Sequence, residues 1–274
     1  MKKPCAIFTS DWHIWGRPPI WRSAEPDWFK AMDRSLRQIR RYQKLNEDLP
    51  VIMPGDIFDF YNPPPEVVNW LIRKMPKNVY AIPGQHDLQN HALDLIEKTG
   101  FWTLVEAGVV HFIPANKSEI VSTISGGPLL QIASKPWGCE ELNELKKSNL
   151  AEIFVFIAHQ YVFKDASTSY VGADKSANIS CSKEQLKEVD VAVFGDNHIP
   201  FLGKVGKTKV VNCGTMIRRK IDERYYETGF VVLYDDLTLG KIPFDISKDN
   251  SLKFQFQKTR ARSKINEPQN YWRN

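Results

Sequence analysis

The sequence contains no apolar stretch that approaches the roughly 20 residues needed to cross a bilayer as a helix. It also contains no internal repeat and no low-complexity segment. The basic start Met1-Lys2-Lys3 resembles the beginning of a signal peptide, but the apolar run behind it stops at Phe8 and acidic Asp11 follows. We therefore expect neither a secretory signal nor contact with a membrane.

Cysteine is scarce as well. The cysteines are widely scattered and show neither the spacing of a thiolate metal site nor that of a disulfide framework: Cys5, Cys139, Cys181 and Cys213. This usage is typical of a reducing compartment, so we expect the protein in the cytoplasm.

Most of the chain lacks an excess of charge of either sign. The net charge of +5 equals that of residues 253–274 alone, where six Lys and Arg side chains accompany one acid, Glu267. We interpret residues 1–250 as one domain and residues 251–274 as a basic C-terminal tail. Such a tail suits an anionic partner, but a solvated tail without any partner explains the same charges.

The sequence does contain a series of short apolar stretches that each end at Asp or His. In open α/β sheets, buried strands deliver site residues to their C-terminal ends, so such endings imply one convergent metal site. Asp56, in the middle of the set, is the candidate ligand shared by two metals. The endings are Asp11-Trp12-His13, Gly55-Asp56 with Asp59, Gly84-Gln85-His86-Asp87, His159, and Asp196-Asn197-His198.

The remaining pattern predicts an α/β fold, with a parallel sheet under helices in the first half and antiparallel strands at the end. The cations of the first helix, which Asp27 would cap, suit either a solvated face or phosphate binding. Helices are expected at residues 27–46, 66–75, 88–99 and 140–149, and further strands at 109–114, 119–125, 129–134, 207–212, 229–234 and 241–245.

Each motif alone arises often by chance, but their order is informative. The order D-x-H, G-D-x-x-D, G-Q-H-D, a strand ending in His, and G-D-x-H resembles the calcineurin-like metallophosphoesterases over residues 6–198. Within them the chain looks most like the SbcD-type nucleases of DNA repair, including phage counterparts, which would place it in the host cytoplasm. Three segments support this branch: residues 27–31, 83–87 and 212–219, the last similar to a G-S-x-x-R element.

The resemblance implies a four-layer α-β-β-α sandwich of two mixed sheets flanked by helices. It also implies two divalent metal ions about 3.5–4 Å apart, which clamp a phosphate ester and activate a water. Mn²⁺ suits the mixed oxygen and imidazole ligands best, with Mg²⁺, Fe and Zn²⁺ as alternatives. The implied ligands are Asp11, His13, Asp56 and His198 for the first metal, and Asp56, Gln85, His159 and Asp196 for the second.

The resemblance also assigns catalysis to His86, beside the leaving oxygen, with Asp87 orienting it. Two positions depart from the family pattern, which usually has Asn at Gln85 and His at Asp196. The extra carboxylate favours a hard cation at the second position. A weakened or empty second position is the alternative.

Three functions fit this reading. The first is a DNA exonuclease or endonuclease acting in repair, recombination or replication, with DNA and an SMC-like (SbcC-type) ATPase as partners and a homodimer as the assembly. Its candidate nucleic-acid contacts are Arg17, Arg22, Arg218 and Arg219. The second is a phosphoesterase of small nucleotides or phosphoproteins, because outer loops alone discriminate these substrates. The third is a non-cleaving DNA-binding subunit.

Overall fold

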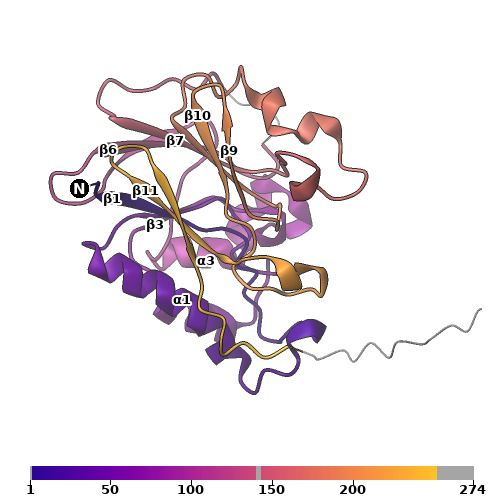
Figure 1. The fold of residues 1–274 in the computed structure, drawn as a ribbon. Helices are drawn as coiled ribbons and strands as arrows, with labels where there is room; N and C mark the ends of the chain where they lie inside the picture. Colours follow the sequence, from indigo (N-terminus) through magenta and orange to yellow (C-terminus); the bar gives the residue numbers. More distant parts are fainter. Residues whose placement is uncertain (1, 140–142, 252–274) are drawn as a thin grey trace, which may run out of the picture.

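The computed structural model describes residues 2–139 and 143–251, and within them the chain forms two mixed six-stranded sheets packed face to face (Figure 1). Helices α1 (Trp28–Leu45), α2 (Pro65–Lys74) and α3 (Gly100–Glu106) flank the first sheet. The predicted sandwich of two mixed sheets with flanking helices is confirmed. The predicted tail lies outside the described residues except for its first residue.

The first sheet joins the two ends of the described chain. The N-terminal strands β1 to β4 pair in parallel. β11 pairs antiparallel with β1, and β12 pairs antiparallel with β11. Because side chains alternate along a strand, Ile7 faces the helices while Ala6 and Phe8 face the second sheet. The strand order is β12 (Leu239–Pro243), β11 (Gly229–Tyr234), β1 (Pro4–Phe8), β2 (Val51–Met53), β3 (Val79–Ala81), β4 (His111–Phe112).

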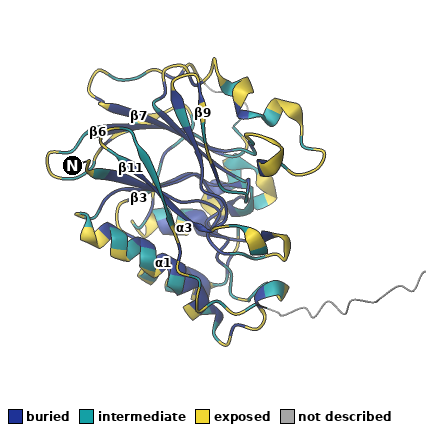
Figure 2. Ribbon diagram, in the orientation of Figure 1, coloured by how far each residue is buried: buried dark blue, intermediate teal, exposed yellow. Residues whose placement is uncertain are grey.

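The second sheet has four parallel strands with an antiparallel strand at each edge. Its outer face is covered by residues 161–190, which form short 3₁₀ turns and bury Val162, Ile179 and Leu186 against Phe156. The strand order is β5 (Ser118–Ser122), β6 (Leu129–Lys135), β7 (Ile153–His159), β8 (Val191–Gly195), β10 (Thr208–Asn212), β9 (Phe201–Val205). Figure 2 shows that the strands are largely buried and that exposed residues gather on turns and on the outer face of α1.

The first helix confirms its predicted cap and stripe. The Asp27 carboxylate accepts a hydrogen bond from the Lys30 amide, and Met32 and Leu36 are fully buried. Part of its basic face is neutralised within the fold, because both Arg37 and Arg40 pair with Asp33 at 2.7 Å. No helix of the described part of the chain is long and apolar enough to cross a membrane.

Two predicted helices are wrong. Residues 88–99 form 3₁₀ turns, because Asn90 and His91 have φ of 54° and 57°, and the α-helix begins only after Thr99, which caps it. Residues 143–149 form no helix, and the Gln131 side chain instead binds backbone atoms of this segment. The sequence reading also missed β9, and β10 runs antiparallel to β9 but parallel to β8.

Candidate metal centre

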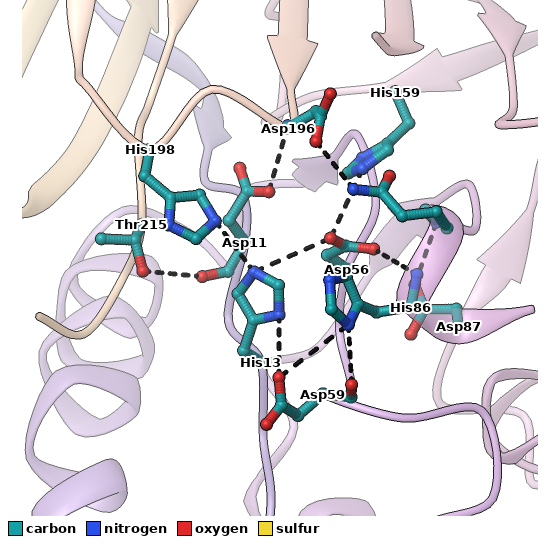
Figure 3. A network of polar contacts seen from close by, with 12 residues as sticks. Asp11, His13, Asp56, Asp59, His86, Asp87, His159, Asp196, His198 and Thr215 are labelled. Atoms are coloured by element: carbon teal, nitrogen blue, oxygen red, sulfur yellow. Dashed lines mark hydrogen bonds and ion pairs between the residues drawn. The ribbon is translucent and has the colours of Figure 1, made fainter. Parts of the chain in front are cut away.

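The predicted metal ligands lie together at the C-terminal ends of strands from both sheets (Figure 3). These strands are parallel within each sheet, so their carboxyl ends share one edge. The structure brings all of the predicted ligand residues to this edge: Asp11 and His13 after β1, Asp56 after β2, Gln85 after β3, His159 at the end of β7, and Asp196 and His198 after β8.

The backbone is strained where it turns these side chains inward. The left-handed region costs an ordinary residue about 1–3 kcal/mol and persists where the surrounding structure enforces it. The neighbouring glycines are also required: Gly55 has φ of 100°, and a Cβ on Gly84 would collide with the Asp56 carboxylate. The φ angles are 49° at Asp11, 46° at His13, 54° at Asp56 and 82° at Asp196.

Three side chains form the first group of ligand atoms. The Nε2 atoms of His13 and His198 lie 3.0 Å apart, and a carboxylate oxygen of Asp11 is within 4.8 Å of both rings' ligand atoms. Two neutral imidazoles satisfy each other only if one of these Nε2 atoms carries a proton. A cation held between them would satisfy both lone pairs at once.

Asp56 lies between this group and a second one. Its Oδ2 atom is 3.7 Å from Nε2 of His13 and 3.5 Å from Nε2 of His159, while Oδ1 accepts a hydrogen bond from the His86 amide. Asp11, Asp56 and His159 also form a close group of possible ligand atoms. This is the placement that a carboxylate needs to bridge two cations.

Several buried atoms of the centre have no hydrogen-bond partner within the described residues. They are Oδ2 of Asp11, Nδ1 of His13, Oε1 of Gln85 and Nε2 of His159. Buried polar groups are nearly always satisfied, so four orphans at one place require an explanation. Two carboxylates, an amide oxygen and imidazole nitrogens form a donor set that a divalent cation fits. The residues present therefore fit the predicted metals.

Outer contacts fix which ring nitrogen faces the centre. Nδ1–H of His159 donates to the Pro54 carbonyl at 2.5 Å, and Nδ1–H of His198 donates to Oε1 of Glu223 at 2.7 Å. Both bonds occupy Nδ1, so Nε2 is the nitrogen that would face a metal. Glu223 is 2% exposed and also accepts from the Arg219 and Lys220 amides. The sequence reading missed it, because no motif links it to His198, 25 residues earlier.

The altered pair, Gln85 and Asp196, is joined directly. Nε2 of Gln85 donates to Oδ1 of Asp196 at 2.7 Å, which fixes the amide so that its oxygen remains as the orphaned acceptor. The Asp196 carboxylate lies outside the close groups of ligand atoms found in the described part of the chain. Its contact with Gln85 assigns it an orienting role, and direct metal ligation by Asp196 stays a prediction.

The predicted role of Asp87 is wrong. Its buried carboxylate accepts hydrogen bonds from the backbone amides of Ile57, Phe58 and Gly84, and so joins two strand ends. His86 is oriented instead by Asp59, whose carbonyl oxygen lies 2.8 Å from Nδ1 of the imidazole. His86 lies beside Asp56 and His13, and its catalytic role stays a prediction.

Burial and neighbouring charges shift the pKa values of the centre's residues in opposite directions. Burial lowers the pKa of His13 to about 4 and raises the pKa of Asp11 to about 6. Burial also disfavours the charged form of His159, but the Asp56 carboxylate outweighs burial and raises the pKa of His159 to about 10. The same pairing holds the pKa of Asp56 well below its usual range, although burial opposes it.

The predicted nucleic-acid contacts divide into arginines that are bound within the fold and one exposed arginine. Arg22 is wrong for that role, because it is 2% exposed and its guanidinium binds Glu25 at 2.5 Å and Asp249 at 3.1 Å. Arg219 pairs with Asp59 at 2.6 Å, and the half-buried Arg218 donates to the Arg224 carbonyl. Arg17 is exposed.

A cleft of about 420 Å³ opens beside the centre. Its inner end is formed by Gln85, His86, Asp196 and His198, and its wall continues to Tyr161, Tyr170 and Tyr226.

Residues 6–200 match the sequence model of the calcineurin-like phosphoesterases. The chain belongs to this family. The family depends on two metal ions, and the centre has the donor set to hold them.

Solved structures of this phosphoesterase fold include two similar 5'-nucleotidases. One, from Staphylococcus aureus and solved with alpha-ketoglutarate, is 14% identical with a TM-score of 0.56, covering 87% of this chain and 52% of its own. The other, from Candida albicans, is 13% identical with a TM-score of 0.52, covering 88% of this chain and 52% of its own. The chain thus spans about half the length of each, and at these identities the likeness shows the fold alone. No curated protein sequence matches the chain.

Proposed function

We propose that this phosphoesterase hydrolyses phosphate esters of small nucleotides. The observation that carries the proposal is the cleft itself, which begins at Gln85, His86 and His198 and has the volume of a site for one small ligand. Two similarly folded proteins are 5'-nucleotidases, which supports the same substrate class here.

The chemistry follows from the donors around the centre. The Asp11–His13–His198 and Asp56–Gln85–His159 groups would each hold a divalent ion, which would supply positive charge and lower the pKa of a water. Asp56 lies between the two groups, with Oδ2 3.7 Å from Nε2 of His13 and 3.5 Å from Nε2 of His159, so it would contribute to both. The Glu223 and Pro54 contacts keep the two metal-facing Nε2 atoms aimed at the centre.

His86 is the proposed proton donor. Its Nδ1–H is held by the Asp59 carbonyl, and the side chain lines the cleft, so Nε2 can exchange a proton with the leaving oxygen. Asp59 is itself held by Arg219 at 2.6 Å. The mutual contacts of these residues keep the ring in place beside Asp56.

A DNA nuclease of the SbcD type is the second candidate. Two exposed cations favour it, Lys220 in the cleft lining and Arg17 elsewhere on the surface, because exposed cations attract a phosphate backbone. The basic tail and an ATPase or homodimeric partner belong to this candidate.

One substrate panel separates the candidates. Purified protein is incubated with Mn²⁺ and 5'-nucleotides, cyclic nucleotides, bis-p-nitrophenyl phosphate and labelled single- and double-stranded DNA. We expect hydrolysis of a small nucleotide, its loss with a chelator, and a fall in kcat of about 100-fold in His86→Ala. His111→Ala, an exposed histidine on β4 and outside the cleft lining, is the control. Cleavage of DNA without hydrolysis of any small nucleotide would replace the first candidate with the second.

A further inference from the structure

The far wall of the cleft is aromatic and has no part in holding metal or phosphate. Tyr161 and Tyr170 come from the segment after β7, and Tyr226 follows the 3₁₀ turn η8 (Asp222–Tyr225). The rings of Tyr161 and Tyr170 lie 4.8 Å apart, tilted by 55°. Tyr170 is 58% exposed, so a large aromatic face is presented to the solvent of the cleft.

The first of these rings, that of Tyr161, is fixed in place. The Tyr170 amide donates a hydrogen bond to the Tyr161 hydroxyl at 3.1 Å, which ties the first ring to the backbone of the second. An aromatic side chain held in this way loses little conformational entropy when a ligand stacks on it.

The segment that carries the rings is anchored to the metal centre itself. Nδ2 of Asn197, which is 2% exposed, donates to the carbonyls of Val162 and Thr168 at 2.7 and 2.8 Å. Asn197 stands between Asp196 and His198 in the sequence. The spacing between the metal-facing atoms and the tyrosines is therefore set by the same short stretch of chain.

The charges around the cleft indicate what this wall receives. Besides the centre's own residues, the lining carries one cation, Lys220, and one free acid, Asp222. A second phosphate beyond the metals would meet two acids, Asp222 and Asp196, against the single cation Lys220, and would on balance be repelled. A neutral, flat group meets the tyrosines without that cost, and every nucleobase has a face that stacks on an aromatic ring.

We propose that Tyr161 and Tyr170 form a base-stacking subsite that selects nucleoside phosphates among phosphate esters. The phosphate lies at the metal centre and the base lies against the tyrosine pair, on the wall that Tyr226 continues. This inference rests on the proposed function.

The test compares matched esters that differ only in the base. AMP is paired with ribose 5-phosphate, and thymidine 5'-p-nitrophenyl phosphate with its abasic analogue 1,2-dideoxyribose 5-p-nitrophenyl phosphate, so that both monoesters and diesters are covered. We expect Tyr170→Ala to lower kcat/KM for the base-containing member about 10-fold and to leave its partner within about twofold. Tyr170→Trp should restore the preference. Tyr225→Ala, an 80% exposed tyrosine outside the cleft lining, is the matched control.

The outcomes distinguish the two proposals. Hydrolysis of both members at equal efficiency, or an equal loss on both in Tyr170→Ala, would overturn the subsite and leave the proposed function standing. Hydrolysis of no pair would reject the proposed function. The subsite would then be decided by equilibrium dialysis with Mn²⁺: tighter binding of AMP than of ribose 5-phosphate, lost in Tyr170→Ala, supports it, and equal or absent binding rejects it.

Discussion

The two halves of the metal centre are prepared for metal in different ways. In the first half, burial lowers the pKa of His13 to about 4, and its Nε2 already lies 3.0 Å from Nε2 of His198. In the second half, the pKa of His159 is raised to about 10 by Asp56, so without metal His159 holds a proton and pairs with that carboxylate. His13 is therefore ready for a cation, whereas His159 must first release a proton.

The donors differ as well. The first half pairs an acid with two imidazoles, and the second combines one imidazole with the Gln85 amide, which Asp196 holds at 2.7 Å. The contrast teaches that the same strand-end scaffold can hold two unlike sites, provided that one carboxylate, Asp56, joins them.

The largest effect is expected when that carboxylate is removed. Asp56→Ala takes a ligand from both halves, and metal activation is worth several kcal/mol, so kcat/KM should fall roughly a thousandfold on the preferred substrate. Asp48→Ala, which breaks only a surface pair with Lys77, should leave kcat/KM unchanged. Steady-state kinetics on both variants would show whether the joint role holds.

A smaller effect is expected from Glu223, which acts on one half alone. Glu223→Gln loses the anionic partner of the His198 ring, and changes of this kind cost about 10–100-fold in metal affinity. Mn²⁺ titration should show weakening at one site only. Glu227→Gln, on the same segment but paired with Lys241, is the control. Equal weakening at both sites would contradict the separation of the halves.

The proton on His159 makes the second half dependent on pH. The pKa of His159 is raised, so below about pH 10 a proton competes with the metal, and affinity should fall about tenfold per pH unit towards acid. Calorimetry in buffers of different ionisation enthalpy should record about one proton released at pH 7 when the second metal binds. His159→Gln should abolish this release, and its persistence would place the proton elsewhere.

The smallest effect on catalysis is expected at Asp87, which joins strand ends rather than orienting His86. Asp87→Asn turns an amide group towards backbone N–H donors and should cost about 1–3 kcal/mol of stability. Thermal unfolding should show the loss, while kcat of the folded protein changes little. His86→Ala should do the reverse, and a kcat loss in Asp87→Asn as large as in His86→Ala would restore the orienting role.

The centre was largely predictable because its residues end strands, and strand ends are visible as apolar runs that stop at Asp or His. Glu223 and Asp59 were harder, since their partners lie far away in the sequence and only tertiary packing brings them together. The same reason explains why the burial of Arg22 was not predicted, because its partner Asp249 lies far away in the sequence. The helix expected at 88–99 failed because two residues with positive φ and the Thr99 cap outweigh the apolar spacing.

The most direct test of the account is the metal content of three proteins after equilibrium dialysis against Mn²⁺, measured by mass spectrometry. If Asp56 bridges two unlike halves, the unmodified chain retains two ions, Gln85→Ala retains one, and Asp56→Ala retains neither. An Asp56→Ala protein that keeps one ion as firmly as Gln85→Ala does would contradict the account.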